Sequence, residues 1–597
     1  MDASLVDRLV ALRSAGSPAF AQDGNRLFHL ADDSGLPQIW SLDLGSGARR
    51  QLTFHDEPVA FLARSPVGDA LAYGTDVGGD ERQQLWLLPA EGAARKLTAR
   101  PDAIHSWGAF APDGARIAYT ANARNGVDFD LHLRDVAGGT ERRLAALTGM
   151  QTVCGWSPDG SAILLREDRS HFDHELRLFE VASGSLRPLP RAHGKARYAA
   201  LRWRKDGSGF YGLTELGGEH LGIVVYDRAT DGFAPVFMAE GADIDGLALA
   251  PDGTLLAATR NRAGWSELLL VSTAGGDARP VASLPRGVIA DLAWSPDSRR
   301  LAFSLTAPTR PRSLWLFDRA TATARDLLPE IAANAGAGLD LVDWRLDEFS
   351  SFDDRRIPTF TAGPGGKPPP GGRKAVIWVH GGPESQTRPV FRPDIQALVA
   401  AGHAVMLPNL RGSTGYGRSY AALDDGPRRP DAVEDLRQAR LWFGAQPDID
   451  AARVAAMGQS YGGFMVLATL ASHPELWKAA VEHYGFADFL TELRDTGPWR
   501  RRHRAAEYGD PERDRDFLHA ASPLTHVDRI RAPLLATHGL RDPRVPPSET
   551  MALVAALRAR GRTIETVIIE NAGHGYLRRD HRRAVWGAVL DFLRRHL

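Results

Sequence analysis

The chain has 597 residues, too many for one hydrophobic core, so we expect two or more domains. Its 43% hydrophobic and 24% charged residues are ordinary for a globular protein, and a net charge of −1 gives no indication of a nucleic-acid or membrane partner. One cysteine, Cys154, excludes an internal disulfide, and the lack of a signal-peptide pattern or an apolar run of about 20 residues predicts a cytoplasmic protein.

The amino-terminal half is repetitive. A short helix is predicted over residues 5–12, within a leading segment of residues 1–16. After it, an aspartate-glycine pair or a degenerate copy of that pair recurs at positions 23, 67, 113, 159, 206, 252 and 297. A period of about 46 residues with tight hairpin turns of this kind is typical of a β-propeller.

Strands with two-residue alternation accompany these turns, for example at residues 39–42 and 314–317. The alternation, the turn glycines and the tryptophans argue against a helical solenoid, which is the other architecture with so long a period. We therefore predict a seven-bladed propeller over residues 17–329. Residues 330–338 are rich in alanine and glycine and predict a linker to a second domain of residues 339–597.

The second domain begins with a hairpin, a proline-glycine loop at 364–372 and a buried strand at 375–379. His-Gly-Gly-Pro follows at 380–383. A glycine loop after an early strand often supplies a backbone donor to an oxyanion hole, and we assign that donor to the N–H of Gly382. The alternative interpretation is a plain glycine turn.

Residues 458–462, Gly-Gln-Ser-Tyr-Gly, match the G-x-S-x-G pattern. This pattern places a serine on a sharp turn between a strand and a helix, where its hydroxyl projects into open space. The flanks fit, because residues 453–457 predict a strand and residues 464–470 an apolar helix. Ser460 is the candidate nucleophile, and the N–H of Tyr461 is the candidate first donor to an oxyanion.

A serine nucleophile needs a base and an acid that orients the base. Asp542 follows a predicted strand, and His574 lies between glycines after the next one, which is the order Ser, Asp, His of α/β-hydrolases. Taken singly, Asp542 is equally a turn-capping carboxylate and His574 a surface histidine. Four other histidines fit the order less well: His473, His483, His538 and His581.

Residues 498–504 carry a run of arginines: Arg500, Arg501, Arg502 and Arg504. Such a run is most often a solvated surface. The functional alternative is a site that binds a carboxylate bidentately, and the free carboxy terminus of a peptide is the obvious candidate. Phe486, Phe489 and Trp499 are candidates for an apolar substrate pocket, although each is equally typical of a core.

Four segments together resemble the prolyl oligopeptidase family, most closely its acylaminoacyl-peptidase branch: residues 380–383, 408–417, 458–463 and 538–546. The resemblance extends over the whole chain. It implies a serine peptidase with the triad Ser460, Asp542 and His574. It also implies that Arg544 points into the cleft and binds a substrate carbonyl, for which the alternative is a surface ion pair.

The resemblance further implies that the propeller covers the active site, so that only short or unfolded peptides reach Ser460, and that the first helix packs on the hydrolase domain. The dipeptidyl peptidases of the family hold a free substrate amine with an adjacent Glu-Glu pair. No such pair occurs in this chain, which argues weakly against that activity.

We therefore predict a serine peptidase, a seven-bladed propeller over an α/β-hydrolase, that hydrolyses short peptides through an acyl-enzyme. No H-E-x-x-H motif or cysteine pair suggests zinc, and the chemistry needs no metal or cofactor. Three alternatives stay open: a carboxypeptidase that uses the arginine run, a carboxylesterase on the same scaffold, and an interaction protein with a vestigial hydrolase. The oligomeric state also stays open, including a homo-oligomer.

Overall fold

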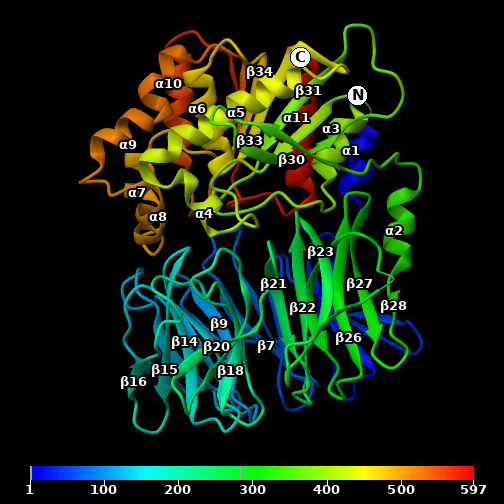
Figure 1. Cartoon of the computed structure of the whole chain (residues 1–597), viewed down its shortest axis with the longest axis vertical. Coiled ribbons are helices and arrows are strands. Elements are labelled where there is room, and N and C mark those ends of the chain that lie inside the picture. Colours follow the sequence, from blue (N-terminus) through cyan, green and yellow to red (C-terminus); the bar gives the residue numbers. More distant parts are fainter. Residues whose placement is uncertain (1–2, 283) are drawn as a thin grey trace.

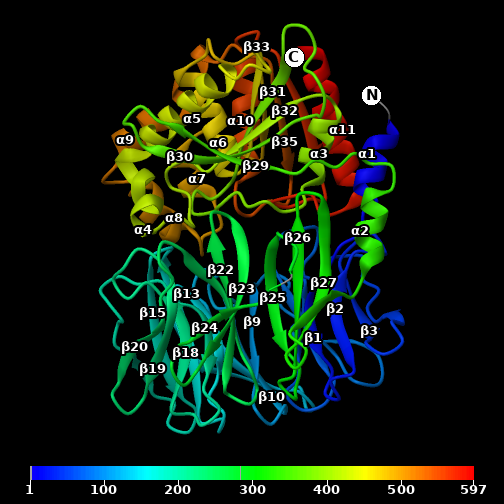
Figure 2. The same ribbon diagram turned by 45° about the vertical axis from the view of Figure 1, so that its right-hand side comes forward.

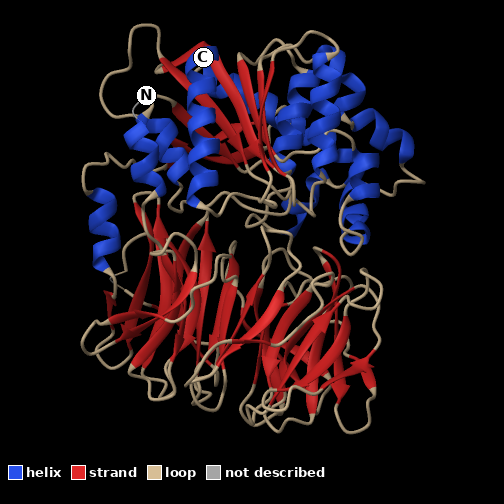
Figure 3. Ribbon diagram, turned by 180° about the vertical axis from the view of Figure 1, so that it is seen from behind, coloured by secondary structure: helices blue, strands red, loops and turns tan. Residues whose placement is uncertain are grey.

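The computed structural model describes residues 3–282 and 284–597, which form two domains stacked along the long axis of the molecule (Figure 1). One domain is a ring of strands, and the other is a sheet covered by helices on both faces (Figure 3). In the described part of the chain, no helix is long and apolar enough to cross a membrane.

The ring consists, within the described residues, of seven four-stranded antiparallel sheets, which confirms the predicted seven-bladed propeller. Each blade is one continuous stretch of sequence, so the first and last blades share no strand and meet through side chains such as Phe20 and Leu316. The first four blades are β1 (Ala15–Phe20), β2 (Arg26–Ala31), β3 (Gln38–Asp43), β4 (Arg49–Gln51); β5 (Phe61–Arg64), β6 (Leu71–Thr75), β7 (Gln84–Leu88), β8 (Arg95–Lys96); β9 (His105–Phe110), β10 (Arg116–Ala121), β11 (Asp130–Asp135), β12 (Glu141–Ala145); and β13 (Met150–Trp156), β14 (Ala162–Ser170), β15 (Asp173–Glu180), β16 (Leu186–Pro188). The last three are β17 (Ala199–Trp203), β18 (Gly209–Thr214), β19 (Gly222–Asp227), β20 (Gly232–Phe237); β21 (Asp243–Leu249), β22 (Leu255–Arg262), β23 (Trp265–Ser272), β24 (Ala278–Pro280); and β25 (Val288–Trp294), β26 (Arg300–Ala307), β27 (Arg310–Asp318), β28 (Thr323–Asp326).

The repeated aspartate-glycine pairs form the turns between the first and second strands of the blades. Gly24 and Gly114 both have φ of 71°, a left-handed conformation that glycine adopts without strain. The preceding carboxylate accepts the N–H two residues later, at 2.9 Å for Asp23 and 2.9 Å for Asp113. The sequence period therefore marks the positions of the tight turns.

The second domain contains an eight-stranded sheet in the order β29-β30-β32-β31-β33-β34-β35-β36. The pairs β29–β30 and β30–β32 are antiparallel and the others are parallel, which is the predicted α/β-hydrolase architecture. The strands are β29 (Arg345–Ser350), β30 (Arg356–Ala362), β31 (Arg373–Val379), β32 (Ala404–Pro408), β33 (Ile449–Gln459), β34 (Ala479–His483), β35 (Leu534–Gly539) and β36 (Ile564–Ile569).

Helices bury both faces of this sheet, so its strands read as continuous apolar runs. In β31, Ala375, Ile377 and Val379 face one core, and Val376 and Trp378 face the other. The first face is covered by α5 (Arg429–Gly444), α6 (Tyr461–Ser472) and α10 (Pro547–Arg558), and the second by α1 (Ala3–Val10), α3 (Pro393–Ala400) and α11 (Arg579–His596). Shorter helices lie around the edges: α4 (Arg418–Ala421), η1 (Ala422–Asp424), η2 (Gly426–Arg428), α7 (Phe489–Asp495), α8 (Arg501–Tyr508), α9 (Arg515–Ala521) and η3 (Pro523–Arg529).

Two segments outside the sheet differ from their predicted form. Helix α1 ends at Val10, two residues before the predicted end, and lies beside α11 of the second domain (Figure 2). The predicted linker contains helix α2 (Pro329–Gly336), because Pro329 starts the helix and the alanines favour it. The connection between the domains is therefore partly helical.

The loops between the second and third strands of the blades contact the second domain. The Arg388 guanidinium donates to the carbonyl of Gly264, in such a loop, at 2.8 Å, and to Asp245 in the first strand of the same blade at 2.5 Å. The backbone N–H of Arg418 donates to the carbonyl of Glu219 at 2.9 Å. These polar contacts hold the carboxyl edge of the parallel strands over one face of the ring.

We predict that replacing Leu9 of α1 by alanine destabilises the second domain by about 2–5 kcal/mol, because a buried leucine is exchanged for a cavity. Leu9 is 2% exposed in the core shared with α3 and α11. The matched control is Leu441→Ala on α5, where the side chain is 41% exposed. Urea unfolding compares the variants, and equal midpoints would show that α1 contributes nothing to this core.

Candidate active site

Ser460 lies on a sharp turn between β33 and α6. Its backbone has φ 55° and ψ −122°, a conformation that a non-glycine residue adopts only when its surroundings enforce it. The N–H of Ser460 donates to the carbonyl of His483 at 2.8 Å. A Cβ at Gly458 would lie 2.3 Å from the carbonyl oxygen of Gly462, so this turn requires the glycine of the motif.

Three side chains from three loops form one hydrogen-bonded chain at the carboxyl edge of the sheet. His574 Nε2 lies 2.9 Å from Ser460 Oγ, and His574 Nδ1 lies 2.7 Å from Asp542 Oδ2. Asp542 follows β35 and His574 follows β36, while Ser460 follows β33. Because the carboxyl ends of parallel strands meet at one edge, residues far apart in sequence converge there.

Asp542 is held as an anion. Its Oδ1 accepts the backbone N–H groups of Arg544 at 2.8 Å and Val545 at 3.1 Å. Burial opposes ionisation, but the charge of His574 and hydrogen bonds from His538 and His574 outweigh it and hold the pKa of Asp542 well below its usual range. The carboxylate therefore fixes the proton of His574 on Nδ1.

Burial lowers the pKa of His574 below its ordinary value of 6.5, and the nearby charges of Arg544 and Arg500 act in the same direction, although Asp542 opposes them. A neutral imidazole with its proton on Nδ1 presents the lone pair of Nε2 to the hydroxyl of Ser460. The three side chains can therefore move a proton from Ser460 to His574.

Among the backbone N–H groups beside Ser460, those of Gly382 and Tyr461 have no hydrogen-bond acceptor within the described residues. The loop that carries Gly382 runs past the serine, since a Cβ at Gly381 would lie 3.1 Å from the Cβ of Ser460. His380 anchors this loop with a ring nitrogen 2.9 Å from Ser413 Oγ. Both predicted oxyanion donors therefore lie next to the serine with their N–H groups free.

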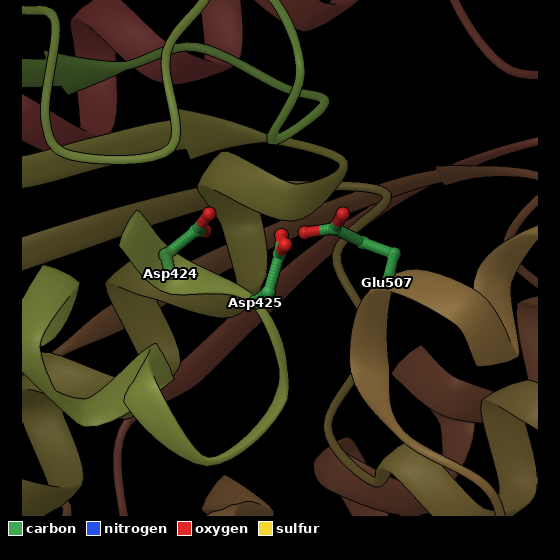
Figure 4. Close-up of side chains that lie close together, drawn as sticks. All are labelled: Asp424, Asp425 and Glu507. Carbon is green, nitrogen blue, oxygen red and sulfur yellow. The ribbon is translucent and has the colours of Figure 1, made fainter. Parts of the chain in front are cut away.

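Carboxylates gather behind the serine turn: Asp424, Asp425 and Glu507 point toward one another (Figure 4), with one oxygen from each within 4.8 Å of the others. Oxygen clusters of this kind are potential metal ligands. Here the Arg429 guanidinium already bonds Asp424 at 2.9 Å and Glu507 at 2.8 Å. The hydroxyl of Tyr461 also donates to Asp424 at 2.8 Å, so this cluster anchors the first residue of α6.

The arginine run divides into exposed and buried side chains. Arg501 and Arg502 are exposed, Arg501 donating to the carbonyl of Arg494 and Arg502 lying 3.9 Å from Glu167 of the propeller. Arg504 is buried, pairs with Glu384 at 3.3 Å and donates to the carbonyl of Gly382 at 3.2 Å. Arg504 therefore supports the Gly382 loop.

Arg500 differs from its neighbours, because its Nη1 is buried and has no hydrogen-bond partner among the described residues. Burial and the charges of Arg504 and Arg544 lower its pKa. Glu492, a buried carboxyl that acts on Arg500, has an unpartnered oxygen of its own, and burial together with Glu549 raises its pKa well above the usual range. No carboxylate among the described residues therefore forms an ion pair with Arg500.

A cavity of about 400 Å³ lies between the domains beside Arg500. Five arginines line it, Arg166, Arg197, Arg500, Arg504 and Arg544, together with His171, His174 and His503 and the carboxylates of Glu81 and Asp168. Burial lowers the pKa of all three histidines, so the positive charge of the lining comes from the arginines. Trp499 also lines this cavity. Phe486 and Phe489 do not line it, and both are buried with Phe464 in the core, which is the alternative that the sequence left open for them.

Arg544 borders the same cavity, but its guanidinium bonds Glu81 of the propeller. The loop that carries Glu81 also touches the His574 loop, since a Cβ at Gly79 would lie 2.8 Å from the N of Gly573. The structure therefore gives Arg544 an ion-pair partner in the other domain. This contact resembles the surface ion pair that the sequence left open as the alternative to carbonyl binding.

Several residues of the site carry no sequence signal. Glu81 and Glu384 lie in segments without a motif. Glu81, in the propeller, meets Arg544 only when the two domains come together, and Glu384 meets Arg504 only when the second domain folds. His538 precedes Asp542 in the chain, so it fits the order Ser, Asp, His less well than His574 as the base. Its contact with Asp542, at 3.4 Å, depends on the conformation of the loop after β35.

The carboxy-terminal part of the chain, residues 389–597, matches the prolyl oligopeptidase family. The chain is 25% identical to dipeptidyl aminopeptidase BIII of Pseudoxanthomonas mexicana, over 96% of this chain and 85% of that protein. The fold is similar to that of a puromycin-hydrolyzing peptidase of Mycobacterium tuberculosis, with a TM-score of 0.88 at 20% identity over 100% and 96% of the two chains.

An acylaminoacyl peptidase of Pyrococcus horikoshii has the same fold, with a TM-score of 0.76 at 18% identity over 99% of this chain and 97% of that one. The family match covers the domain that carries the serine turn, and the likeness of fold extends over both domains. Residues 389–597 therefore match the prolyl oligopeptidase family, and the relatives and solved structures that resemble the chain are peptidases, which makes it a serine-type peptidase.

Proposed function

We propose that Ser460, His574 and Asp542 are the catalytic triad of this peptidase and that it hydrolyses short peptides. The single observation that carries the proposal is the continuous hydrogen-bonded chain, 2.9 Å from serine to histidine and 2.7 Å from histidine to aspartate, at a serine on a strained turn. Nucleophile, base and orienting acid within hydrogen-bond reach are the requirement for covalent acyl transfer.

In the proposed reaction, Ser460 Oγ attacks the scissile carbonyl carbon while His574 Nε2 takes the hydroxyl proton. The N–H groups of Tyr461 and Gly382 stabilise the oxyanion, and Asp542 stabilises the imidazolium. His574 then gives the proton to the leaving amine. Water, activated by His574, hydrolyses the acyl-enzyme and restores Ser460.

The restriction to short peptides is supported by the position of the cavity between the propeller and the catalytic domain. A folded protein does not fit a volume of about 400 Å³, whereas a few residues of an extended peptide do. The related dipeptidyl aminopeptidase and acylaminoacyl peptidase are both named for acting at a chain terminus. A carboxylesterase activity at the same site is the alternative. Comparing the turnover of activated esters with that of peptide anilides distinguishes the two activities.

A second candidate function is cleavage near a free carboxy terminus. The observation that favours it is the buried guanidinium of Arg500, which lacks a carboxylate partner within the described residues and faces a cavity with a cationic lining. A peptide carboxylate there would gain charge-assisted hydrogen bonds and would offset the repulsion among Arg500, Arg504 and Arg544.

Replacing Ser460 by alanine is expected to lower kcat on peptides and esters by roughly 10⁴- to 10⁶-fold, because the triad acts as a unit. The thermal transition stays within a few degrees of the parent, and a fluorophosphonate probe labels the parent only. The control is Ser385→Ala, which changes a serine in the nearby Gly382 loop. Peptide turnover at the parental rate by pure Ser460→Ala would end the proposal.

We expect kcat/KM to fall at low pH with the titration of one group and a midpoint below 6.5. The pKa of His574 is lowered by burial, so the neutral base persists to lower pH than a free imidazole and is lost as pH falls through that pKa. A pH–rate profile on a peptide anilide measures this. Enzyme held at each pH and assayed again at pH 8 controls for unfolding, and a midpoint above 7 contradicts the assignment.

Arg500→Ala is expected to abolish a preference of about tenfold or more for free-acid over amidated peptides, since one charge-assisted hydrogen bond is worth about 1.5–3 kcal/mol. Arg500→Lys restores the preference only partly, because the bidentate fork is lost. Arg501→Ala is the matched control on the exposed side of the run. Equal rates for acid and amide in the parent would remove the carboxy-terminal proposal, and faster cleavage of N-acetylated peptides would favour acylaminoacyl release.

A further inference from the structure

The carboxylate of Asp542 contacts two imidazoles. His574 Nδ1 is 2.7 Å from Oδ2, and His538 Nε2 is 3.4 Å from the same oxygen. His538 is the penultimate residue of β35 and is 0% exposed. The triad proposed above uses only one of these histidines.

Both ring nitrogens of His538 face oxygen atoms. Nε2 lies 3.0 Å from the carbonyl oxygen of Val545, besides its contact with Asp542, and both of these oxygens only accept. Nδ1 lies 2.7 Å from the hydroxyl of Thr550, on α10. That hydroxyl lies 3.5 Å from Oε1 of Glu482, on the neighbouring strand β34.

This arrangement constrains the protons. Nε2 must carry one, because it faces acceptors only. The Thr550 hydroxyl has a single proton, and when it donates to a Glu482 carboxylate it can only accept from His538, which then carries a second proton on Nδ1. His538 is an imidazolium in that state. The alternative state places the second proton on Glu482 and leaves His538 neutral, with the Thr550 hydroxyl reversed.

We propose that His538 is a positioning residue of the triad, a buried imidazolium that holds Asp542 and shares its second proton with Glu482 through the Thr550 hydroxyl. The inference rests on the function proposed above. A positive charge at this position keeps Asp542 ionised and partly neutralises it. Asp542 then stabilises the imidazolium of His574 less, so His574 loses its proton at lower pH.

The groups that face His538 agree with this assignment. Burial on its own would lower the pKa of His538, but Asp542 and Glu482 raise it above 6.5. Burial raises the pKa of Glu482 to about 7, near the ordinary value of an imidazole, so a proton can move between Glu482 and His538. From the loop after β34, the ring of Tyr484 meets His538 edge to face at 6.5 Å and brings no charge at neutral pH.

The test compares pH–rate profiles of the full-length parent and His538→Gln on an activated ester and a peptide anilide. Glutamine keeps an N–H donor near Nε2 but carries no charge. Removing a positive charge beside Asp542 stabilises the imidazolium of His574, so the apparent pKa of kcat/KM rises by about one unit while KM changes less than about twofold.

The matched control is His403→Gln. His403 is also buried, between α3 and β32, and it has no hydrogen bond or ion pair with the triad among the described residues. This variant removes a comparable side chain and leaves the apparent pKa unchanged. Thr550→Val is the second test variant, in which His538 remains but its Nδ1 loses the acceptor. The apparent pKa rises in this variant too, by less than in His538→Gln.

Superimposable profiles for the parent, Thr550→Val and a folded His538→Gln would overturn the proposal and assign His538 to packing alone. If His538→Gln does not fold, Thr550→Val decides by the same criterion. This inference and the proposed function fail in different ways. If only this inference is wrong, the pH profile is unshifted and Ser460→Ala is still inactive. If the proposed function is wrong, Ser460→Ala is active.

Discussion

The close packing of backbone around the serine turn is the constraint on which the site depends. The carbonyl of Gly462 leaves no space for a side chain at Gly458, and the carbonyl of Val379 leaves none at Gly462, where a Cβ would lie 2.2 Å away. This contact brings β31, β33 and α6 together and holds Ser460 at φ 55°. The strain fixes the hydroxyl at the carboxyl edge of the sheet, where the loops after β35 and β36 reach it.

Electrostatics then decides what each buried ionisable group does. Several buried carboxylates around the site have a guanidinium partner, as Glu384 has Arg504 and Asp424 has Arg429. Such pairs support loops and helix ends, and removing one partner leaves a costly buried charge. Arg500 differs from the other arginines of the cavity, because no described residue forms an ion pair with it. A cation without an ion-pair partner in a cavity is a property of a binding site more than of a scaffold.

The propeller contributes contacts to the loops of the site. Its blade-two loop places Glu81 on Arg544 and Gly79 against the loop of His574, so one short segment contacts the loops of both the proposed acid and the proposed base. The geometry of the triad is therefore linked to the docking of the two domains. The polar contacts across the interface, such as Arg388 with Asp245, are of the kind that allow domains to separate.

The amino-acid sequence alone determined the two domains, the seven blades, the serine turn and the order Ser460, Asp542, His574, because turns and motifs are local and repeat in chain order. It did not determine the helix over Pro329–Gly336, since an alanine-glycine composition fits a linker equally well. The sequence also did not show that Nη1 of Arg500 is buried whereas Arg501 is exposed, or that Phe489 lies in the core. Those distinctions, like the contacts of Glu81 and His538, arise from residues remote in the chain, and burial and charge balance exist only once tertiary packing has brought them together.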